Sequence, residues 1–177
     1  MKFRKLQTEE IIRQNIEEFR HSRKTPLVVV LEDIRSMHNI GSVFRTADAF
    51  CLEKLILCGI TATPPHSEIH KSALGAEFSV EWEYNQNICQ ALESLRIEGY
   101  TICALEQTED SQSLHKLKID NSKKYALVFG NEVSGVTQEA IDLCHYSIEI
   151  PQFGTKHSLN VSVAAGIAIW DFFKALH

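Results

Sequence analysis

The stretch Leu27-Val28-Val29-Val30-Leu31 decides the fold class of this 177-residue chain. It is short, continuously apolar and rich in β-branched side chains, which is typical of a strand buried on both faces of a parallel sheet. From Asn39 to Phe50, apolar residues then recur at helical spacing. A buried strand followed by an amphipathic helix predicts the first unit of an α/β fold.

The same alternation continues toward the C-terminus. Short apolar runs predict strands at 54–58, 100–105, 125–129 and 148–150, and helical spacing predicts helices at 88–97, 137–144 and 158–176. Pro64-Pro65 predicts a loop ahead of a short helix within 61–79. The sequence therefore predicts one α/β domain over residues 26–177, with a mainly parallel sheet flanked by helices.

Residues 1–25 form a basic extension ahead of this domain. They hold seven Lys and Arg against four Glu, although the whole chain has a net charge of -5. Thr8 is expected to cap an amphipathic helix over residues 9–21. Such a segment could contact the phosphates of a nucleic acid, and a solvated amphipathic helix would give the same charge pattern.

Composition limits the class of protein. Hydrophobic residues make up 44% and charged residues 23% of the chain, as in a soluble globular domain. No export signal is recognisable, and the apolar stretch 161–170 is about half as long as a membrane span requires. Five cysteines without a C-x-x-C pair predict reduced thiols in the cytoplasm rather than disulfides or a zinc site.

Several common catalytic motifs are absent from the sequence. There is no G-x-G-x-x-G, no G-x-x-x-x-G-K-[ST] and no G-x-S-x-G. His66 and His70 stand four residues apart, but Glu68 is one place away from its position in H-E-x-x-H. We therefore expect a polar surface loop at 66–70 and no metal ion.

Three polar segments follow expected strands, at the edge of the sheet where ligands bind in such folds. They are Asn39 to Thr46, Gly130 to Gly135 and Ile150 to Asn160. Asn39 and Ser158 are expected to cap the helices that follow them, and Gly41 lets a backbone or a ligand approach closely. Taken alone, each segment also fits a plain structural role, such as a cap, an edge ion pair or a tight turn.

Together the three segments resemble the signature motifs of the SpoU (TrmH-like) family of RNA methyltransferases, in the SPOUT superfamily. They match N-x-G-x-x-x-R-T, G-N-E-x-x-G and I-P-x-x-G-x-x-x-S-L-N-V in this order, and the resemblance covers about residues 26–174. It implies a C-terminal deep trefoil knot that forms a pocket for S-adenosylmethionine, and a homodimer with both cofactor sites near the interface.

The resemblance also implies roles for individual residues. Those carried over as catalytic are Asn39, Arg45, Glu132, Ser158 and Asn160, and those carried over to the cofactor pocket are Leu105, Gly130, Ile150, Ser158 and Leu159. Candidate phosphate contacts on RNA are Arg23, Lys24, Lys71 and Lys156.

The implied reaction is methylation of a ribose 2′-hydroxyl. A guanidinium group stays protonated and does not act as a base, so Arg45 is expected to bind the neighbouring phosphate and stabilise the alkoxide, with Asn39 orienting it. Gln152 stands where many relatives have Met, and the resulting I-P-Q-x-G form of the third motif resembles that of tRNA guanosine-18 methyltransferases of the eukaryotic type. Ribosomal RNA is an alternative substrate, whereas DNA is not expected to be one because it lacks the 2′-hydroxyl. Two rival functions are a non-catalytic RNA-binding module and a small-molecule enzyme.

Overall fold

The computed structural model describes residues 3–177, apart from the side chain of Thr8, so the predicted cap at Thr8 lies outside the described part. Seven parallel strands form one sheet in the order β3-β2-β1-β6-β4-β7-β5. The strands are β1 (Thr25–Glu32), β2 (Leu52–Cys58), β3 (Trp82–Asn85), β4 (Tyr100–Leu105), β5 (Gln112–Ser113), β6 (Lys124–Phe129) and β7 (Tyr146–Glu149). The predicted α/β fold with a parallel sheet is confirmed.

Strand β1 lies in the middle of the sheet and is buried on both faces. Residues 27–31 are each at most 1% exposed. Leu27, Val29 and Leu31 face one hydrophobic core, whereas Val28 and Val30 face the other. Two cores on opposite faces explain why this strand is continuously apolar instead of alternating.

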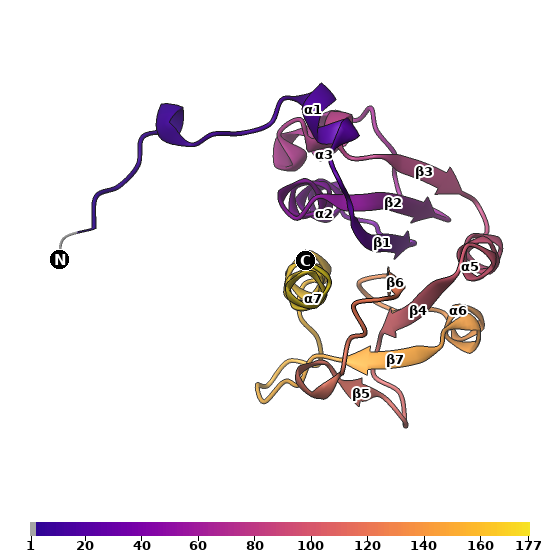
Figure 1. Cartoon of the computed structure of the whole chain (residues 1–177). Helices are drawn as coiled ribbons and strands as arrows, with labels where there is room; N and C mark the ends of the chain where they lie inside the picture. The colour runs from indigo at the N-terminus through magenta and orange to yellow at the C-terminus, as the bar shows by residue number, and fades with distance from the viewer. Residues whose placement is uncertain (1–2) are drawn as a thin grey trace.

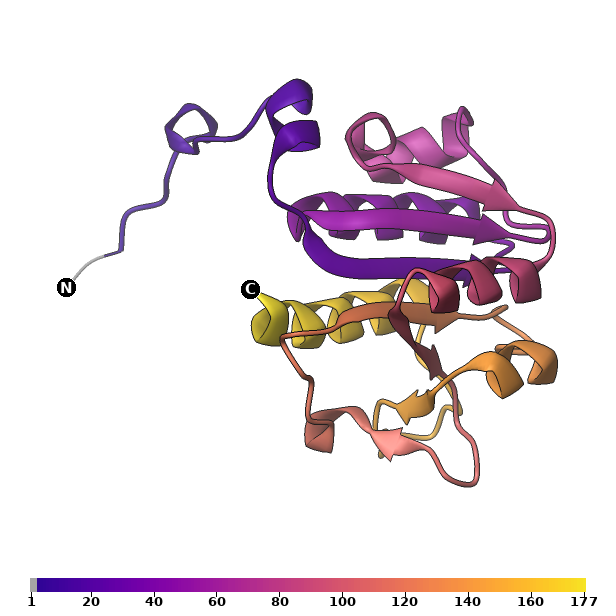
Figure 2. The same ribbon diagram turned by 45° about the vertical axis from the view of Figure 1, so that its right-hand side comes forward.

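Helices cover both faces of the sheet, as Figures 1 and 2 show. One layer contains α1 (Ile16–His21), α2 (Met37–Ala49), α3 (Ser67–Ala73), α4 (Ala76–Ser79) and α7 (Val161–Leu176), and the other contains α5 (Ile88–Ile97) and α6 (Gln138–Leu143). Short 3₁₀ helices are η1 (Thr8–Glu10) and η2 (Leu114–Lys116). The predicted helices at 88–97 and 137–144 are confirmed, the second with Thr137 as its N-cap.

The sequence did not predict strands β3 and β5. Strand β5 has only two residues, and β3 is a four-residue edge strand with no buried residue, so both are too short to stand out in the sequence. The last strand ends one residue earlier than predicted: β7 stops at Glu149, and Ile150 belongs to the following loop.

The predicted helix over residues 9–21 is wrong. Only α1 is α-helical there, and it is capped by Asn15, which forms a capping box with Glu18. Phe19 is the buried residue of α1, whereas Ile12 is 99% exposed. Figure 1 shows the chain before α1 running away from the body of the molecule. A helix of this length needs packing to be stable, and this segment has none on its N-terminal side.

Candidate active site

The loops after β4, β6 and β7 meet at the carboxyl edge of the sheet and surround a pocket of about 640 Å³. This volume lies within the usual range for small-molecule sites. All five residues predicted to bind the cofactor line the pocket: Leu105, Gly130, Ile150, Ser158 and Leu159. Glu132 and Asn160 line it too.

A hydrogen-bonded chain of three side chains joins the three sequence motifs beside this pocket. The Nδ2 atom of Asn160 donates to Oδ1 of Asn39 at 3.1 Å, and Nδ2 of Asn39 donates to Oε1 of Glu132 at 3.1 Å. The partners are 121 and 93 residues apart in the sequence. The fold thus brings three of the five predicted catalytic residues into direct contact.

The predicted N-caps of two helices, Asn39 and Ser158, are wrong. Ser36, not Asn39, caps α2, and this leaves the Asn39 carboxamide free for the other motifs. Asn160, not Ser158, caps α7 by accepting from the backbone N–H groups of Ser162 and Val163. The helix therefore begins at Val161, and Ser158 remains in an exposed loop at the pocket.

The carboxylate of Glu132 also fixes the start of the α2 segment. It accepts hydrogen bonds from the backbone N–H groups of Arg35 at 3.1 Å and Ser36 at 3.2 Å. Partial burial opposes ionisation, but these donors and Asn39 hold the pKa of Glu132 below its ordinary value. Glu132 is therefore ionised at neutral pH and acts as an acceptor rather than an acid.

The second motif forms a tight turn that opens onto the pocket. Asn131 and Gly135 exchange two backbone hydrogen bonds, of 3.0 and 2.9 Å. A Cβ atom on Gly130 would lie about 2.1 Å from the carbonyl carbon of Gly135, so only glycine fits there. The sequence prediction missed the role of Asn131, whose buried side chain donates to the carbonyl of Asp33 at 2.7 Å and anchors the turn.

Glu106 is a second pocket residue that the sequence prediction missed. It follows β4 directly, and its carboxylate accepts from the backbone N–H groups of Val136 at 3.0 Å and Gln107 at 2.9 Å. It therefore ties the end of β4 to the second motif. Its position could have identified Glu106 from the sequence, because it is a charged residue immediately after a predicted buried strand.

Arg45 is exposed and is absent from the residues that line the pocket. It stands six residues after Asn39, which places it about 9 Å along the axis of α2 and about 120° around it. Asn39 instead bonds to Glu132 and Asn160, so the predicted orienting contact between Asn39 and Arg45 is not formed within the chain.

Gly41 serves helix packing rather than a ligand. A Cβ atom there would lie 2.2 Å from Oγ of Ser72 and 2.3 Å from the carbonyl oxygen of Ile69. The first-motif glycine therefore lets α2 and α3 approach closely.

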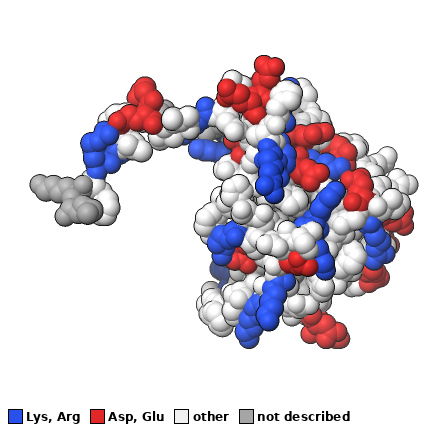
Figure 3. Space-filling view, viewed as in Figure 1, with Lys and Arg blue, Asp and Glu red and all other residues white. Residues whose placement is uncertain are grey.

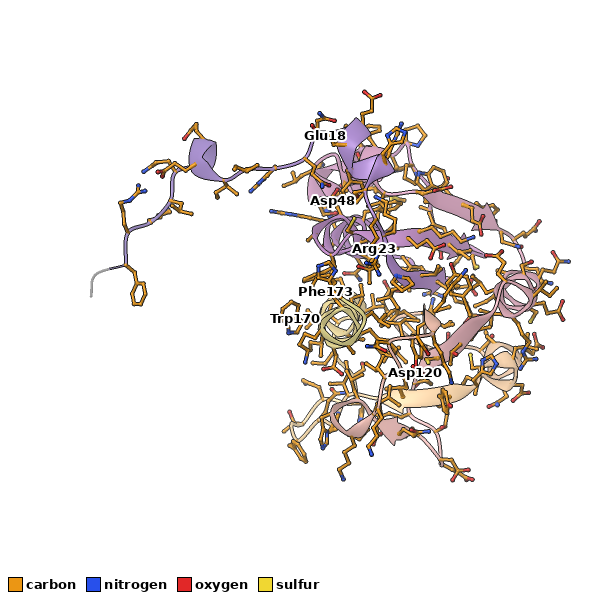
Figure 4. The ribbon with its side chains drawn as sticks, viewed as in Figure 1. Glu18, Arg23, Asp48, Asp120, Trp170 and Phe173 are labelled. Carbon is orange, nitrogen blue, oxygen red and sulfur yellow. The ribbon has the colours of Figure 1, made fainter. Side chains whose placement is uncertain are left out.

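The candidate RNA contacts lie in three different places. Arg23 and Lys24 precede β1 and so lie at the amino edge of the sheet, whereas the pocket lies at its carboxyl edge; the eight residues of β1 span about 26 Å. The ammonium of Lys24 donates to the carbonyl of Phe19 and lies 3.4 Å from the centroid of its ring. Lys71 pairs with Glu68 at 2.6 Å, and Lys156 is exposed in the loop after β7. Figure 4 labels Arg23.

The histidine cluster at 66–70 is occupied by structural contacts. His66 caps α3 by accepting from the backbone N–H of Glu68 at 3.2 Å, and Nδ1 of His70 lies 2.5 Å from Oε1 of Glu77. This segment begins α3 instead of forming the predicted surface loop. Within residues 3–177, no three His, Cys, Asp or Glu side chains are grouped to hold a metal ion.

Burial protects three of the five free cysteines. It raises the pKa of the thiols of Cys58, Cys103 and Cys144 to about 12, so these thiols are protonated at neutral pH. Among the helices of residues 3–177, none is long and apolar enough to cross a membrane.

Comparison with known proteins gives the family. The model of the SpoU rRNA Methylase family matches residues 26–170. The chain is 31% identical over 159 residues to a tRNA (guanosine(18)-2′-O)-methyltransferase of Thermus thermophilus, with 90% of this chain and 80% of the relative covered.

Two solved structures have the same fold. The TrmH/SpoU tRNA modifying enzyme of A. aeolicus has a TM-score of 0.80 at 28% identity, covering 90% of this chain and 80% of its own. The AdoMet-bound rRNA methyltransferase of Sinorhizobium meliloti also has a TM-score of 0.80 at 28% identity, but this chain spans only 59% of its length. The chain therefore belongs to the SpoU rRNA Methylase family of RNA methyltransferases.

Proposed function

We propose that this protein transfers the methyl group of S-adenosylmethionine to a ribose 2′-hydroxyl of tRNA, with guanosine 18 as the first position to test. The observation that carries the proposal is the chain of hydrogen bonds from Asn160 through Asn39 to Glu132, beside a pocket of the right size. The identity to the Thermus thermophilus enzyme and the Gln152 signature favour tRNA as the substrate.

The pocket residues fit the cofactor. Leu105 and Ile150 provide half-buried apolar walls, and the close packing of Gly130 against Gly135 keeps side chains out of one side of the pocket. Bound S-adenosylmethionine supplies an electrophilic methyl group on a sulfonium, which is a good leaving group without a metal. The hydrogen bonds of Glu106 and Glu132 hold two pocket loops in place before the cofactor binds.

The protein must position the 2′-hydroxyl and stabilise the charge that develops on it. Arg45 binds the phosphate next to the target ribose and stabilises the forming alkoxide, while that phosphate or a water molecule accepts the proton. Ser158 and Asn160 shape the mouth of the pocket where the ribose enters. The carboxylate of Glu132 accepts from three donors, which favour its ionised form, so in this proposal it orders the mouth and takes no part in proton transfer.

A homodimer would complete this site. Val163, Ile167 and Trp170 follow one another at helical spacing on α7 and are 41–50% exposed. They line an apolar groove of about 530 Å³ whose other wall includes Ile150, a residue shared with the cofactor pocket. Figure 4 labels Trp170 on α7. A second copy on this groove would cover the apolar stripe next to the cofactor site.

Arg45 is the residue that a second copy would supply, because it does not line the pocket of its own chain. Mixing an Arg45→Ala variant with a Ser158→Ala variant tests this arrangement. Recovery of activity in the mixture would show that two chains share the site, whereas two activities that merely add would show that each chain uses its own Arg45.

The deep trefoil knot belongs to the same proposal. The chain leaves β7, which lies between β4 and β5, and returns as α7 beside α2 and β1 at the middle of the sheet. On the way, Gln152 and residues 157–161 line a pocket together with the loops after β4 and β6. In the proposed knot, the segment after β7 passes through the loop that joins β4 to β6. This passage would explain why the three loops meet around one pocket.

The substrate class is tested by tritiated methyl transfer from S-adenosylmethionine to bulk tRNA and, separately, to ribosomal RNA, both from cells that lack this protein. Label in tRNA alone is expected. Label in ribosomal RNA alone would replace the proposed substrate, and label in neither pool with cofactor bound would favour a non-catalytic RNA-binding module. On the face seen in Figure 3, acidic and basic side chains are interspersed, so overall charge does not decide between these substrates.

A further inference from the structure

The loop after β7 has two chemically different parts. Gln152 and His157 line the cofactor pocket, whereas the residues between them, 153–156, do not and are all exposed. The two ends of the loop therefore form the pocket wall, and its apex projects beyond the rim.

Phe153 at this apex is 98% exposed. Burial of an apolar aromatic side chain is favourable, so a fully exposed phenylalanine beside a binding pocket is available for a partner. Across the same pocket, Val133 of the second motif is 80% exposed. Apolar surface is thus presented on two loops at the mouth of the pocket.

The charge of this loop differs from that of the pocket below it. Residues 150–161 contain Lys156 and His157 and no Asp or Glu, although the whole chain has a net charge of -5. The pocket wall, in contrast, contains Glu106, Glu132 and Glu149. An exposed aromatic ring three residues from a lysine, on an acid-free loop, is the combination that binds an unstacked nucleotide, since the ring stacks on the base and the cation attracts the phosphate.

We propose that Phe153 stacks on a base of the RNA substrate at or next to the methylated nucleotide, with Lys156 contacting a neighbouring phosphate. This inference rests on the proposed RNA methyltransferase function and adds the residue that holds the nucleotide at the rim. Phe153 lines neither the cofactor pocket nor the apolar groove on α7, so those two sites do not account for its exposure.

Four variants test the stacking. Phe153→Ala removes the ring, Phe153→Leu keeps an apolar side chain without a ring, and Phe153→Tyr keeps the ring. Ile97→Ala removes a comparably exposed apolar side chain, 88% exposed at the end of α5 on the other face of the sheet. Methyl transfer to bulk tRNA gives kcat and the KM for RNA, and calorimetry gives the Kd for S-adenosylmethionine.

Phe153→Ala is expected to raise the KM for RNA about tenfold, the effect of losing one base–aromatic stack, and to leave the cofactor Kd unchanged. Phe153→Leu should come close to the alanine variant, while Phe153→Tyr and Ile97→Ala should behave like the unmodified chain. A benzoylphenylalanine at position 153 should crosslink to tRNA on irradiation.

Three results would overturn the stacking role while leaving the proposed function intact: an unchanged KM for RNA in Phe153→Ala, a weakened cofactor Kd in that variant, or a crosslink to a second copy of the chain instead of RNA. Failure of the unmodified chain to methylate any RNA would instead overturn the proposed function, and this inference with it.

Discussion

The two edges of the sheet use side-chain hydrogen bonds in different ways. At the amino edge, Lys24 and Ser22 donate to the nearby carbonyl of Phe19, and the longer side-chain bonds of residues 22–25 run to Phe50 and Cys51, 25–29 residues away. At the carboxyl edge, Asn39 joins side chains that are 93 and 121 residues away. The first pattern ties α1 to the neighbouring turn before β2, whereas the second holds segments far apart in the sequence in one arrangement beside a pocket.

This difference separates structural polar groups from functional ones. Local side-chain-to-backbone bonds are common wherever a chain turns. Bonds between side chains of distant segments are less common, and all their members must be present together for the arrangement to hold. The proposed function places the chemistry at the carboxyl edge, and this proposal can be tested by substitutions paired across the two edges or within one element.

The largest effect is expected from Arg45→Ala. Loss of the guanidinium should lower kcat by about 100-fold or more, because charge on the transition state loses its main stabilising group, while the cofactor Kd stays unchanged. Arg23→Ala, an exposed arginine at the amino edge, is the control and should retain kcat. Equal losses in both variants in a methyl-transfer assay would remove the distinction between the edges.

Asn39→Ala should have the next largest effect. It leaves Glu132 and Asn160 without their shared partner, and the resulting displacement of the pocket mouth should lower kcat/KM by about 10- to 100-fold. Ser42→Ala on the same helix removes a hydroxyl that donates only to the carbonyl of His38, and it should have little effect. Similar kcat/KM values for Asn39→Ala and the unmodified chain would contradict a catalytic role for the network.

Two glycines of the pocket loops should differ in their effect on stability. Gly130→Ala places a Cβ atom about 2.1 Å from backbone atoms of Gly135 and should cost about 1–3 kcal/mol in the free energy of unfolding. Gly154→Ala has no atom within 4 Å of its new Cβ and should be close to neutral. Denaturant unfolding measures both; equal stabilities would mean that the turn of the second motif adapts freely.

The smallest effect is the pH dependence that Glu132 contributes. Its folded-state pKa is below the ordinary value of 4.5, so its ionised form stabilises the folded chain above about that pH, and this contribution is lost as the pH falls through the lowered pKa. Glu132→Gln should therefore lower Tm at pH 7, and the two Tm values should converge as the pH falls below 4.5 and through the lowered pKa. A Tm difference that grows on acidification would show that the carboxylate is not held in its charged form.

The regular elements of the fold were largely predictable from the sequence. Residues 27–31 and 100–105 lie in strands that are covered on both faces of the sheet, so their apolar pattern predicts a central position in the sheet. The edge strands β3 and β5 were missed because they bury little, and the helix expected over 9–21 fails because nothing packs against its first part.

At the site, the motifs predicted residues that the fold brings together, but the sequence did not predict their contacts. Asn39 and Asn160 follow the local capping pattern equally well, yet only Asn160 is a cap, because Ser36 starts α2 one turn earlier. The bond between their side chains depends on the packing of α2 and α7, which sequence spacing does not encode. Glu106 and Asn131 were missed for the same reason, since their partners lie in other segments.

The central claim, that this protein methylates a ribose in RNA, is tested most directly by identifying the methylated atom. Purified protein is incubated with tRNA and S-adenosylmethionine, the RNA is digested to nucleosides, and the products are separated by mass spectrometry. The account predicts a 2′-O-methylnucleoside that is lost in the Arg45→Ala variant. Methylation of a base instead of the ribose, or no methylated nucleoside at all, would contradict the claim, whereas an undiminished yield in the Arg45→Ala variant would remove only the role proposed for Arg45.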